Sequence, residues 1–420
     1  MFFSALVALA SAAVAAGICF AMQRGYIASP VSLPSERSLH GKAIARGGGV
    51  GIVAAMLLGW VWLGASWHLV GALVALWAIS AWDDWTGAPP LARLAVQAVA
   101  AGIITYFWLG LGQPIVALFT TIALIWATNL FNFMDGADGI AASSALTGGI
   151  ALGTFFLLVG GDGKDISQHF AFTARASWVV AAASLGFLVF NFPPAKMFMG
   201  DGGSTVLGLS LAALGAKGIV DGTWVPAVPL AVFMPLWADA TYTLFRRVMQ
   251  GHAPTKPHRD HIYQRLALAG LGHLGLLFWI VGWNLISIGV AFLLRGFGPL
   301  IGVALVTVYA AFYVSFSEWT LRKQPNLLMN PRALLALLYD VVAAACAWAL
   351  LFWARFNFNI DSADFKASDV LRSLAIVVPV HAAVFVGLGL YQGLWRFASM
   401  ADLRRIVLGA FAATAASAVV

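Results

Sequence analysis

The chain has 420 residues, of which 61% are hydrophobic and only 10% charged, and its formal net charge is +7. Soluble domains are about 25% charged, so the composition excludes a string of soluble domains and predicts an integral membrane protein. Its Lys and Arg residues lie between apolar runs rather than on one soluble face, so we expect no nucleic-acid partner. Both cysteines lie inside apolar runs, which argues against a disulfide or a zinc site.

Apolar runs of about 20 residues, the length that a membrane helix needs, predict an all-α polytopic protein with about eleven transmembrane helices. In chain order they lie near residues 1–22, 49–64, 67–82, 94–109, 113–129, 140–159, 174–192, 203–219, 225–245, 273–293 and 298–316. Two or three extra C-terminal membrane helices, near 333–353, 370–391 and 404–420, follow a polar stretch. We therefore expect a membrane domain over 1–320, a cytoplasmic linker over 321–332 and a separate membrane segment over 333–420.

The first apolar run lacks the basic start of a signal peptide, and basic residues follow it instead. We expect this run to stay in the protein as a span, with the N-terminus outside. Most Lys and Arg residues up to position 332 then fall in cytoplasmic loops, as the positive-inside tendency requires. The loops with further polar side chains fall on the same side, which favours one composite site that faces the cytoplasm.

The first polar motif is the pair Asp83 and Asp84 at the end of the third predicted span, with Arg93 at the start of the next. An ionised Asp costs roughly 2.5–3.5 kcal/mol at the bilayer centre, and less at the interface. The pair therefore needs water, a metal ion or a cationic partner. A solvated helix end without a chemical role is the alternative.

The second motif places two amides and two carboxylates within eleven residues: Asn129, Asn132, Asp135 and Asp138. Their spacing of three puts them on one helical face if the helix continues. Hard oxygen ligands of this kind suit Mg²⁺, with Mn²⁺ as an alternative, and Mg²⁺ binds through one or two carboxylates together with substrate phosphate. A polar helix end is again the alternative.

The third motif holds Lys196, Phe198 and Asp201 in a Gly-rich turn before an apolar run. Such a turn at a helix N-terminus presents free backbone amides to a phosphate. Asp201 could there hold a cation that bridges diphosphate oxygens, and Phe198 offers a ring for a base. An ordinary tight turn with Asp201 as the helix cap is the alternative.

The fourth motif is a basic loop that contains His258, Arg259, His261 and Arg265. Its histidines lack the spacing of a zinc site, and its arginines would repel a divalent ion. Recognition of phosphate by imidazole and guanidinium groups is therefore the better interpretation, and a plain positive-inside loop is the alternative. Arg46, which precedes three glycines in the first loop, adds another cation.

Acids that hold Mg²⁺ and cations that hold phosphate are the parts of a phosphoryl-transfer site. At a membrane surface, one substrate can be soluble and the other a lipid. The residues alone thus predict a Mg²⁺-dependent transfer of a phosphate-bearing group to or from a lipid. The main alternative is a secondary transporter of an anionic substrate, which would place essential acids near the bilayer midplane, and Asp239 in the ninth predicted span is the main candidate for such an acid.

In these ordered motifs the sequence resembles the polyprenyl-phosphate N-acetylhexosamine-1-phosphate transferases over about residues 1–320. The resemblance implies an enzyme of the bacterial inner membrane that transfers N-acetylhexosamine-1-phosphate from a UDP-N-acetylhexosamine to undecaprenyl phosphate and releases UMP. Its product would start a lipid-linked glycan such as an O-antigen, and a homodimer is one expected assembly. Consecutive histidines mark the branch that accepts a muramoyl peptide. This chain has His258-Arg-Asp-His261 instead, which favours a donor such as UDP-GlcNAc or a 6-deoxy relative.

The motifs and the resemblance together give a set of candidate site residues. The expected catalytic residues are Asp83, Asp84, Asp135, Asp138, His258 and His261. The expected substrate-binding residues are Arg46, Asn129, Asp138, Lys196, Phe198, Arg259 and Arg265, and the expected Mg²⁺ ligands are Asn132 and Asp201. By the resemblance, the aspartate pair would lie near the lipid phosphate, for positioning or deprotonation, and Asp138 and Phe198 would lie at the uracil.

Residues 333–420 are similar to the membrane region that precedes the catalytic domain of polysaccharide-biosynthesis nucleotide-sugar dehydratases and epimerases. The similarity rests on Tyr339-Asp340 and on the Tyr391 to Arg405 stretch. No dinucleotide-binding Gly-x-Gly-x-x-Gly motif follows. We therefore expect a truncated or fused module that serves as a membrane anchor.

Overall fold

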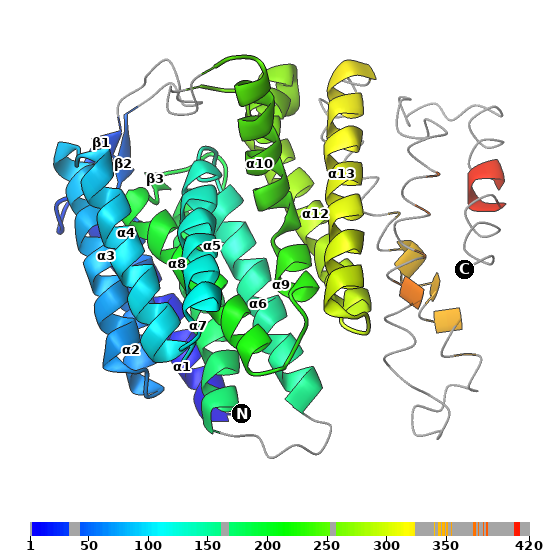
Figure 1. The fold of residues 1–420 in the computed structure, drawn as a ribbon. Coiled ribbons are helices and arrows are strands. Elements are labelled where there is room, and N and C mark those ends of the chain that lie inside the picture. The colour runs from blue at the N-terminus through cyan, green and yellow to red at the C-terminus, as the bar shows by residue number, and fades with distance from the viewer. Residues whose placement is uncertain are drawn as a thin grey trace.

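The structure is a computed structural model that describes residues 2–32, 43–160, 168–252 and 258–323, together with scattered helical residues between 340 and 411. The predicted all-α fold is confirmed, because these ranges form a bundle of long helices with one very small sheet (Figure 1). Seven helices in these ranges are long and apolar enough to cross a membrane. The protein is therefore a multi-pass membrane protein. The predicted linker and C-terminal segment lie mostly outside the described residues.

The helices follow one another with mostly short connections. From the N-terminus they are α1 (Phe2–Gln23), α2 (Gly49–Trp62), α3 (Trp67–Thr86), α4 (Pro90–Ile103), its π-helical continuation η1 (Ile104–Trp108) and α5 (Pro114–Phe133). They continue with α6 (Ile140–Gly160), α7 (Gln168–Asn191), α8 (Asp201–Val220), α9 (Ala227–Val232), α10 (Met234–Met249), α11 (Ile262–Leu266), η2 (Ala267–Leu271), α12 (Gly272–Leu294) and α13 (Pro299–Lys323). The strands are β1 (Val31–Ser32), β2 (Ile44–Arg46) and β3 (Met197–Phe198).

Each of the eleven predicted spans overlaps a described helix, and the differences have local causes. The ninth predicted span is broken at Phe233, whose φ of −102° and ψ of 16° depart from the α-helical region. Pro229 and Pro235 flank this break, and each proline removes a backbone donor from the helix. Near the predicted linker, α13 continues to Lys323, so the first residues of the polar stretch are helical.

The central helix of the bundle is α8. Fourteen of its 20 residues are buried, whereas only three of the 14 residues of α4 are. It packs against α2, α3, α5, α6 and α7, because its glycines let the neighbouring helices approach closely. At Gly208, for example, an added Cβ would lie 3.0 Å from the Cα of Thr128 in α5. Because α8 begins at Asp201, this packing determines where that carboxylate lies.

The small sheet, which the sequence did not predict, joins segments that are far apart in the chain. β1 pairs antiparallel with β2, and β2 pairs parallel with β3, with Arg46 opposite Phe198. The N–H groups of Gly47 and Gly48 then both donate to the Phe198 carbonyl, at 3.0 and 2.9 Å. The strands have only two or three residues, too few for the alternation that identifies a strand. Their role is to hold Arg46 beside the start of α8.

Gly49, at the start of α2, contacts α8 backbone to backbone. A Cβ on Gly49 would lie 2.4 Å from the Cα of Gly203, an atom that cannot rotate away. We expect Gly49→Ala to lower the free energy of unfolding by about 1–3 kcal/mol, the usual range for overpacking, and to lower the thermal unfolding midpoint measured in detergent. Gly71→Ala in α3 is the control, because nothing lies within 4 Å of a Cβ there. Equal midpoints for Gly49→Ala and the wild type would contradict this packing.

Candidate functional site

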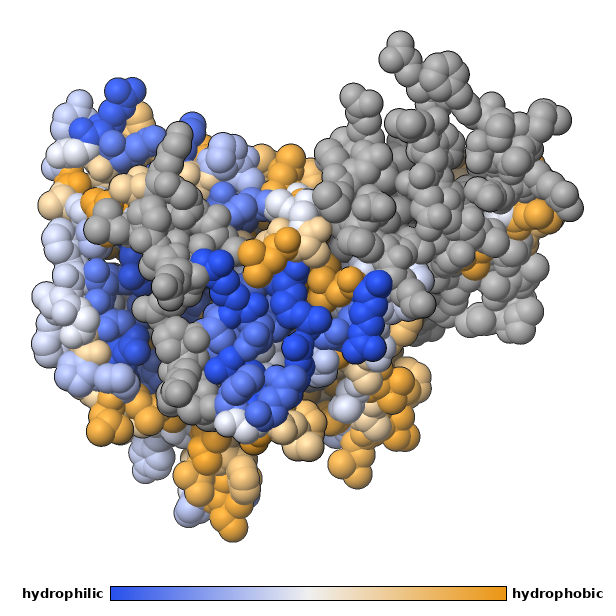
Figure 2. Space-filling model, turned by 90° about the horizontal axis from the view of Figure 1, so that it is seen from above, coloured by the Kyte–Doolittle hydropathy of each residue, from blue (hydrophilic) through white to orange (hydrophobic). Residues whose placement is uncertain are grey.

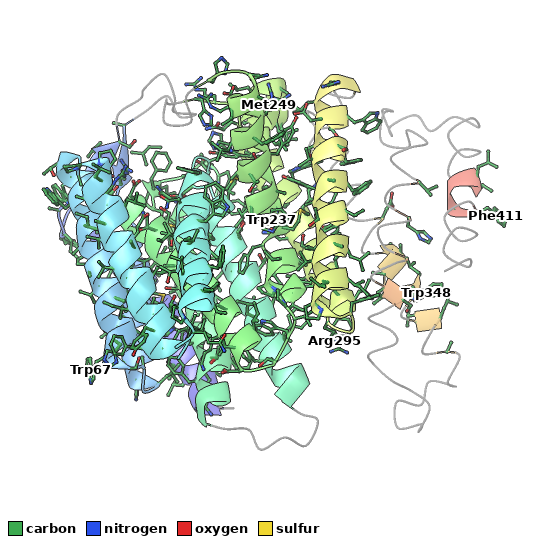
Figure 3. The ribbon with its side chains drawn as sticks, viewed as in Figure 1. Trp67, Trp237, Met249, Arg295, Trp348 and Phe411 are labelled. Atoms are coloured by element: carbon green, nitrogen blue, oxygen red, sulfur yellow. The ribbon has the colours of Figure 1, made fainter. Side chains whose placement is uncertain are left out.

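The polar motifs lie at one end of the bundle. Seen from above, hydrophilic residues gather at the centre of this face, with apolar residues along its lower edge (Figure 2). Met249, at the end of α10, lies at this end, whereas Trp67 and Arg295 lie at the other (Figure 3). The start of α1 also lies at the opposite end from the small sheet (Figure 1). The candidate site and the beginning of α1 are therefore on opposite faces of the molecule.

Asp84, in the last turn of α3, makes the central contact of this site. Its two oxygens accept the first backbone N–H groups of α8, from Asp201 at 2.9 Å and from Gly202 at 3.0 Å. A carboxylate at a helix N-terminus is stabilised by these otherwise unpaired donors and by the helix dipole. Gly200 precedes the helix with a φ of +79°, and a Cβ there would lie 2.6 Å from Asp84 Oδ2. Glycine satisfies both the conformation and the contact.

The hydrogen bonds at the start of α8 contradict the prediction of free amides in the Gly-rich turn. The cap geometry also excludes the alternative in which Asp201 is the helix cap. The Gly-rich turn was expected to present free amides to a phosphate, but Asp84 already binds the first two. The next two, of Gly203 and Ser204, donate to the Gly200 carbonyl at 3.1 and 3.2 Å. Asp201 is not the cap either, because Gly200 occupies the N-cap position and Asp201 is the first helical residue. Its carboxylate instead pairs with Arg46 and Arg93.

Two arginines lie between the carboxylates. Arg46 Nη2 lies 2.6 Å from Asp201 Oδ1 and 2.9 Å from Asp84 Oδ1. Arg93 Nη1 lies 3.1 Å from Asp201 Oδ2 and also pairs with Asp83. Burial alone would lower the pKa of Arg46, but the Asp84 and Asp201 carboxylates raise it. Arg93 is not among the predicted site residues, although its place at the start of the helix after the aspartate pair could have indicated it.

Asp135, half-buried in the turn after α5, completes what we call the acid cluster, which consists of Asp83, Asp84, Asp135 and Asp201. Burial and the charges of Asp201 and Asp84 raise the pKa of Asp135 well above its ordinary value, while Arg46 lowers it. When ionised, the cluster carries four negative charges against two positive charges from Arg46 and Arg93. The surplus of two negative charges equals the charge of one divalent cation.

The four polar residues of the second motif do not lie on one helical face, because the helix does not continue through the motif. α5 ends at Phe133, and the two carboxylates of the motif lie in the turn that follows, which ends at Gly139 with a φ of +77°. Asn132 instead reaches α8, where its Oδ1 accepts a hydrogen bond from Ser204 Oγ at 2.6 Å. Asn129, one turn earlier, pairs with Gln97 of α4 through both side-chain amides, at 2.8 and 3.4 Å.

Asp138 makes a separate set of contacts. Its Oδ2 accepts the Ala195 N–H at 2.9 Å, and its Oδ1 lies 3.1 Å from Nδ1 of His273, near the start of α12. The sequence did not indicate His273, which lies eight residues beyond Arg265, the last residue of the basic motif. Through Ala195, Asp138 fixes the segment that leads into β3. That segment carries two predicted substrate-binding residues, Lys196, which is exposed, and Phe198, which is half-buried.

The loop before α11 returns into the bundle. Asp239 lies ten residues before the end of α10, about 15 Å along the helix axis at 1.5 Å per residue, and it is fully buried. It accepts the N–H groups of Ile262 and Tyr263, each at 2.9 Å, and contacts His261 Nδ1 at 3.2 Å. The Tyr263 hydroxyl donates to the Phe133 carbonyl at 3.1 Å. The basic loop therefore reaches the end of α5, two residues before Asp135.

The other predicted residues of this loop are placed differently. His258 and Arg259 are half-buried, and the ring centroids of His258 and His261 are 5.1 Å apart. Burial and the charges of His261 and Arg247 lower the pKa of His258. Arg265 points to α13, where its guanidinium forms two hydrogen bonds with the Glu318 carboxylate. The structure thus uses Arg265 to join α11 to α13 and does not bring it to the acid cluster.

The acid cluster fits a magnesium ion by its charge and by its ligands. Among the described residues, no three Asp, Glu, His or Cys side chains converge closely enough to enclose a metal ion by themselves. Mg²⁺ usually needs only one or two carboxylates and takes its other ligands from water and substrate phosphate. Asp201 and Asp135 would supply the carboxylates, and the Asn132 amide oxygen lies beside the same end of α8.

Known proteins share much of this chain. The model of glycosyl transferase family 4 matches residues 66–219, which run from α3 to α8. A probable undecaprenyl-phosphate N-acetylglucosaminyl 1-phosphate transferase of Bacillus subtilis is 29% identical over 266 residues, which are 58% of this chain and 71% of the relative. A decaprenyl-phosphate N-acetylglucosaminephosphotransferase of Mycolicibacterium smegmatis is 31% identical over 304 residues, 62% of this chain and 74% of the relative. The chain belongs to the polyprenyl-phosphate N-acetylhexosamine-1-phosphate transferase family.

Family membership confirms the resemblance inferred from the motifs. A phospho-N-acetylmuramoyl-pentapeptide-transferase of Shouchella clausii is 45% identical, but only over 93 residues, 22% of this chain and 26% of the relative. The two N-acetylglucosamine enzymes are therefore similar to a much larger part of this chain than the Shouchella clausii enzyme is. The similarity of residues 333–420 to dehydratase membrane regions stays a prediction.

The raised pKa of Asp135 predicts a pH-dependent effect on stability. Its pKa is higher in the folded protein than the ordinary value of 3.8, so the unfolded chain binds fewer protons and the carboxylate destabilises the fold increasingly as the pH rises. We expect Asp135→Asn, which cannot ionise, to unfold at a higher temperature than the wild type at pH 8, with a difference that shrinks towards pH 4. Thermal unfolding midpoints in detergent across this range measure the effect.

Asp221→Asn is the matched control for this experiment. Asp221 follows α8 at its far end and pairs with Lys217 at 2.7 Å, so it lies outside the acid cluster. Its substitution should not reproduce the pH-dependent gain. If the midpoint difference between Asp135→Asn and the wild type were the same at pH 8 and pH 4, the electrostatic account of Asp135 would be wrong.

Proposed function

We propose that this protein transfers N-acetylhexosamine-1-phosphate from a UDP-sugar to undecaprenyl phosphate and releases UMP. The observation that carries the proposal is the acid cluster interleaved with Arg46 and Arg93 at one end of a membrane bundle. Family membership supports the reaction class. The names of the relatives specify a polyprenyl phosphate and N-acetylglucosamine, which favours UDP-GlcNAc as the donor.

In the proposed reaction, an oxygen of the lipid phosphate attacks the β-phosphorus of the donor in line. A bond forms between that oxygen and the β-phosphorus, the bond to the bridging oxygen breaks, and its electron pair leaves with UMP. A phosphate monoester has a second pKa of about 6, so the attacking group is largely ionised at pH 7. The site therefore has to position charged groups and stabilise them, and Arg46 and Arg93 are the cations that adjoin the cluster.

Asp83 and Asp84 fit a positioning role. Each is bound by an arginine and by backbone amides: Asp83 accepts the Ala88 N–H at 2.6 Å, and Asp84 accepts two from α8. A bound Mg²⁺, or Mn²⁺ in its place, would neutralise charge on the diphosphate, and Asp201, Asp135 and Asn132 would hold it. The imidazoles of the basic loop would face the diphosphate or the sugar.

We further propose that the site faces the cytoplasm of a bacterial cell, in the inner membrane, and that the N-terminus lies outside. This proposal is supported by the position of the α1 start at the end opposite the site (Figure 1) and by the distribution of basic residues among the loops. The lipid-linked product would start a glycan such as an O-antigen.

The transporter hypothesis gains nothing from Asp239, the acid that motivated it. Both oxygens of Asp239 accept backbone N–H groups of α11, and the same carboxylate contacts His261. A carboxylate that anchors a loop in this way cannot exchange a transported ion without releasing the loop.

An exchange assay tests the proposed function. Purified protein in detergent is supplied with undecaprenyl phosphate, Mg²⁺ and a panel of UDP-N-acetylhexosamines, and both UMP release and labelled sugar in the lipid phase are measured. We expect product only when lipid, donor and metal are all present, with UDP-GlcNAc preferred and with activity lost in EDTA. Asp201→Asn should lower kcat by about 10²-fold or more, as the loss of one preorganised electrostatic group does elsewhere.

The matched control is again Asp221→Asn. It also replaces a carboxylate by an amide, but near the other end of α8, and it should keep the wild-type rate. Absence of product with every donor, from protein that elutes as one species and unfolds cooperatively, would reject the transferase. Full activity in EDTA would reject the metal while leaving the transfer in place.

A further inference from the structure

We propose that Asp239 is a positioning residue that holds His261 as the Nδ1–H tautomer, and that the neighbouring His258 is held in the opposite, Nε2–H tautomer. The inference deepens the proposed function, because it gives the two imidazoles of the basic loop different tasks toward a diphosphate. Neither this role of Asp239, which the sequence indicated only as an acid of the transporter alternative, nor the pairing of tautomers follows from the sequence motifs.

The environment of Asp239 determines what His261 must do. Its Oδ1 accepts the Ile262 N–H at 2.9 Å and the Thr243 hydroxyl at 3.1 Å, and its Oδ2 accepts the Tyr263 N–H at 2.9 Å. An ionised carboxylate can only accept hydrogen bonds, and both oxygens of Asp239 already accept from these donors. The contact of His261 Nδ1 with Asp239 Oδ1 at 3.2 Å therefore places the proton on Nδ1, and it leaves Nε2 of the neutral ring as a bare acceptor.

The backbone around His258 determines the other tautomer. The Asp260 N–H donates to His258 Nδ1 at 3.3 Å, so this nitrogen is the acceptor and the proton of the neutral ring lies on Nε2. The nearest carboxylate oxygen, Asp260 Oδ2, is 3.8 Å away and pairs with Arg247. The Nδ1 atom of His258 thus accepts from a backbone N–H, and the carboxylate near it is paired with an arginine. The Nδ1 atom of His261 instead contacts the carboxylate of Asp239, which is fully buried.

The two rings therefore differ in what they can offer a ligand. Neutral His258 donates its Nε2–H to a phosphate oxygen without carrying charge. His261 has to take up a proton at Nε2 before it can donate there, and the Asp239 carboxylate then balances the charge of the imidazolium, as carboxylates oriented behind a histidine do in other enzymes. With ring centroids 5.1 Å apart, one neutral and one charged donor can face the same diphosphate.

The tautomers can be measured without any activity. Protein with ¹⁵N-labelled histidine in lipid nanodiscs gives ring-nitrogen resonances that show which nitrogen carries the proton, and His258→Asn and His261→Asn assign them. At a pH where both rings are neutral, we expect the proton on Nδ1 of His261 and on Nε2 of His258, and we expect Asp239→Asn to change only His261. A proton on Nε2 of neutral wild-type His261, or an unchanged tautomer in Asp239→Asn, would overturn the proposal.

A double-mutant cycle tests the functional consequence. We expect Asp239→Asn to lower kcat by about 10- to 100-fold, as loss of a supporting hydrogen-bond partner does at metal-bound histidines, with a smaller change in the KM for the donor. In a His261→Asn background the same substitution should cost nothing further, because the residue through which it acts is gone. An equal loss in both backgrounds would show that Asp239 only stabilises the fold.

Thr243→Val is the matched control, since it removes one hydrogen bond from Asp239 and leaves the His261 contact in place. It should keep both the wild-type tautomers and the wild-type kcat. If Asp239→Asn does not fold, the wild-type resonances still decide the proposal. If the wild type transfers no sugar from any donor, the proposed function fails while the tautomer assignment stands or falls on its own spectra.

Discussion

The site depends on one carboxylate that is shared between two helices. Asp84 lies at the C-terminal end of α3, where a negative charge opposes that helix's dipole. The structure compensates by directing the carboxylate at the N-terminus of α8, where it accepts two backbone N–H groups and lies 2.9 Å from Arg46. Hydrogen bonds to a charged group are worth about 1.5–3 kcal/mol each, so these contacts can outweigh the unfavourable end of α3. Because α8 is the buried centre of the bundle, the position of Asp201 follows.

The same arrangement occurs a second time. Asp239 of α10 accepts the first two N–H groups of α11, as Asp84 does for α8, and a side chain able to carry positive charge lies beside each carboxylate: His261 in one case and Arg46 in the other. Helix termini within or near a membrane cannot rely on bulk water for their unpaired amides. A buried acid satisfies two of them at once, and it also fixes the side chain next to it. The acid cluster and the imidazole loop are thus anchored in the same way, each by a carboxylate that accepts the first two N–H groups of a helix.

The sequence predicted much of this architecture because helix positions follow from local apolar runs. The acid motifs could also be recognised, because charged residues are rare in such a chain and each group stands out. The partners of these acids could not be predicted. That Asp84 caps α8, that Arg93 reaches Asp201, and that Arg265 pairs with Glu318 all depend on which helices become neighbours.

The glycines of the first loop show the same limit. The sequence showed only that three glycines follow Arg46. In the structure they make a close contact, because Gly49 leaves no space for a side chain against Gly203. The small sheet was equally hidden, since two or three residues per strand carry no periodic pattern. The chemical character of the polar side chains could therefore be inferred from the sequence. The tertiary contacts that position these side chains could not.

The surplus of two negative charges in the acid cluster also limits the order in which ligands can arrive. Two like unit charges 4 Å apart repel by about 4 kcal/mol at an effective dielectric constant of 20, so the fully ionised cluster would repel a bare diphosphate until a cation enters or accompanies it. Arg46 and Arg93 each hold a second carboxylate besides Asp201. If a cation binds the Asp201 carboxylate, both arginines can turn toward phosphate while each keeps its ion pair with the other carboxylate, Asp84 for Arg46 and Asp83 for Arg93. For the proposed reaction, this charge count means that a cation has to enter the cluster before the nucleotide sugar or together with it.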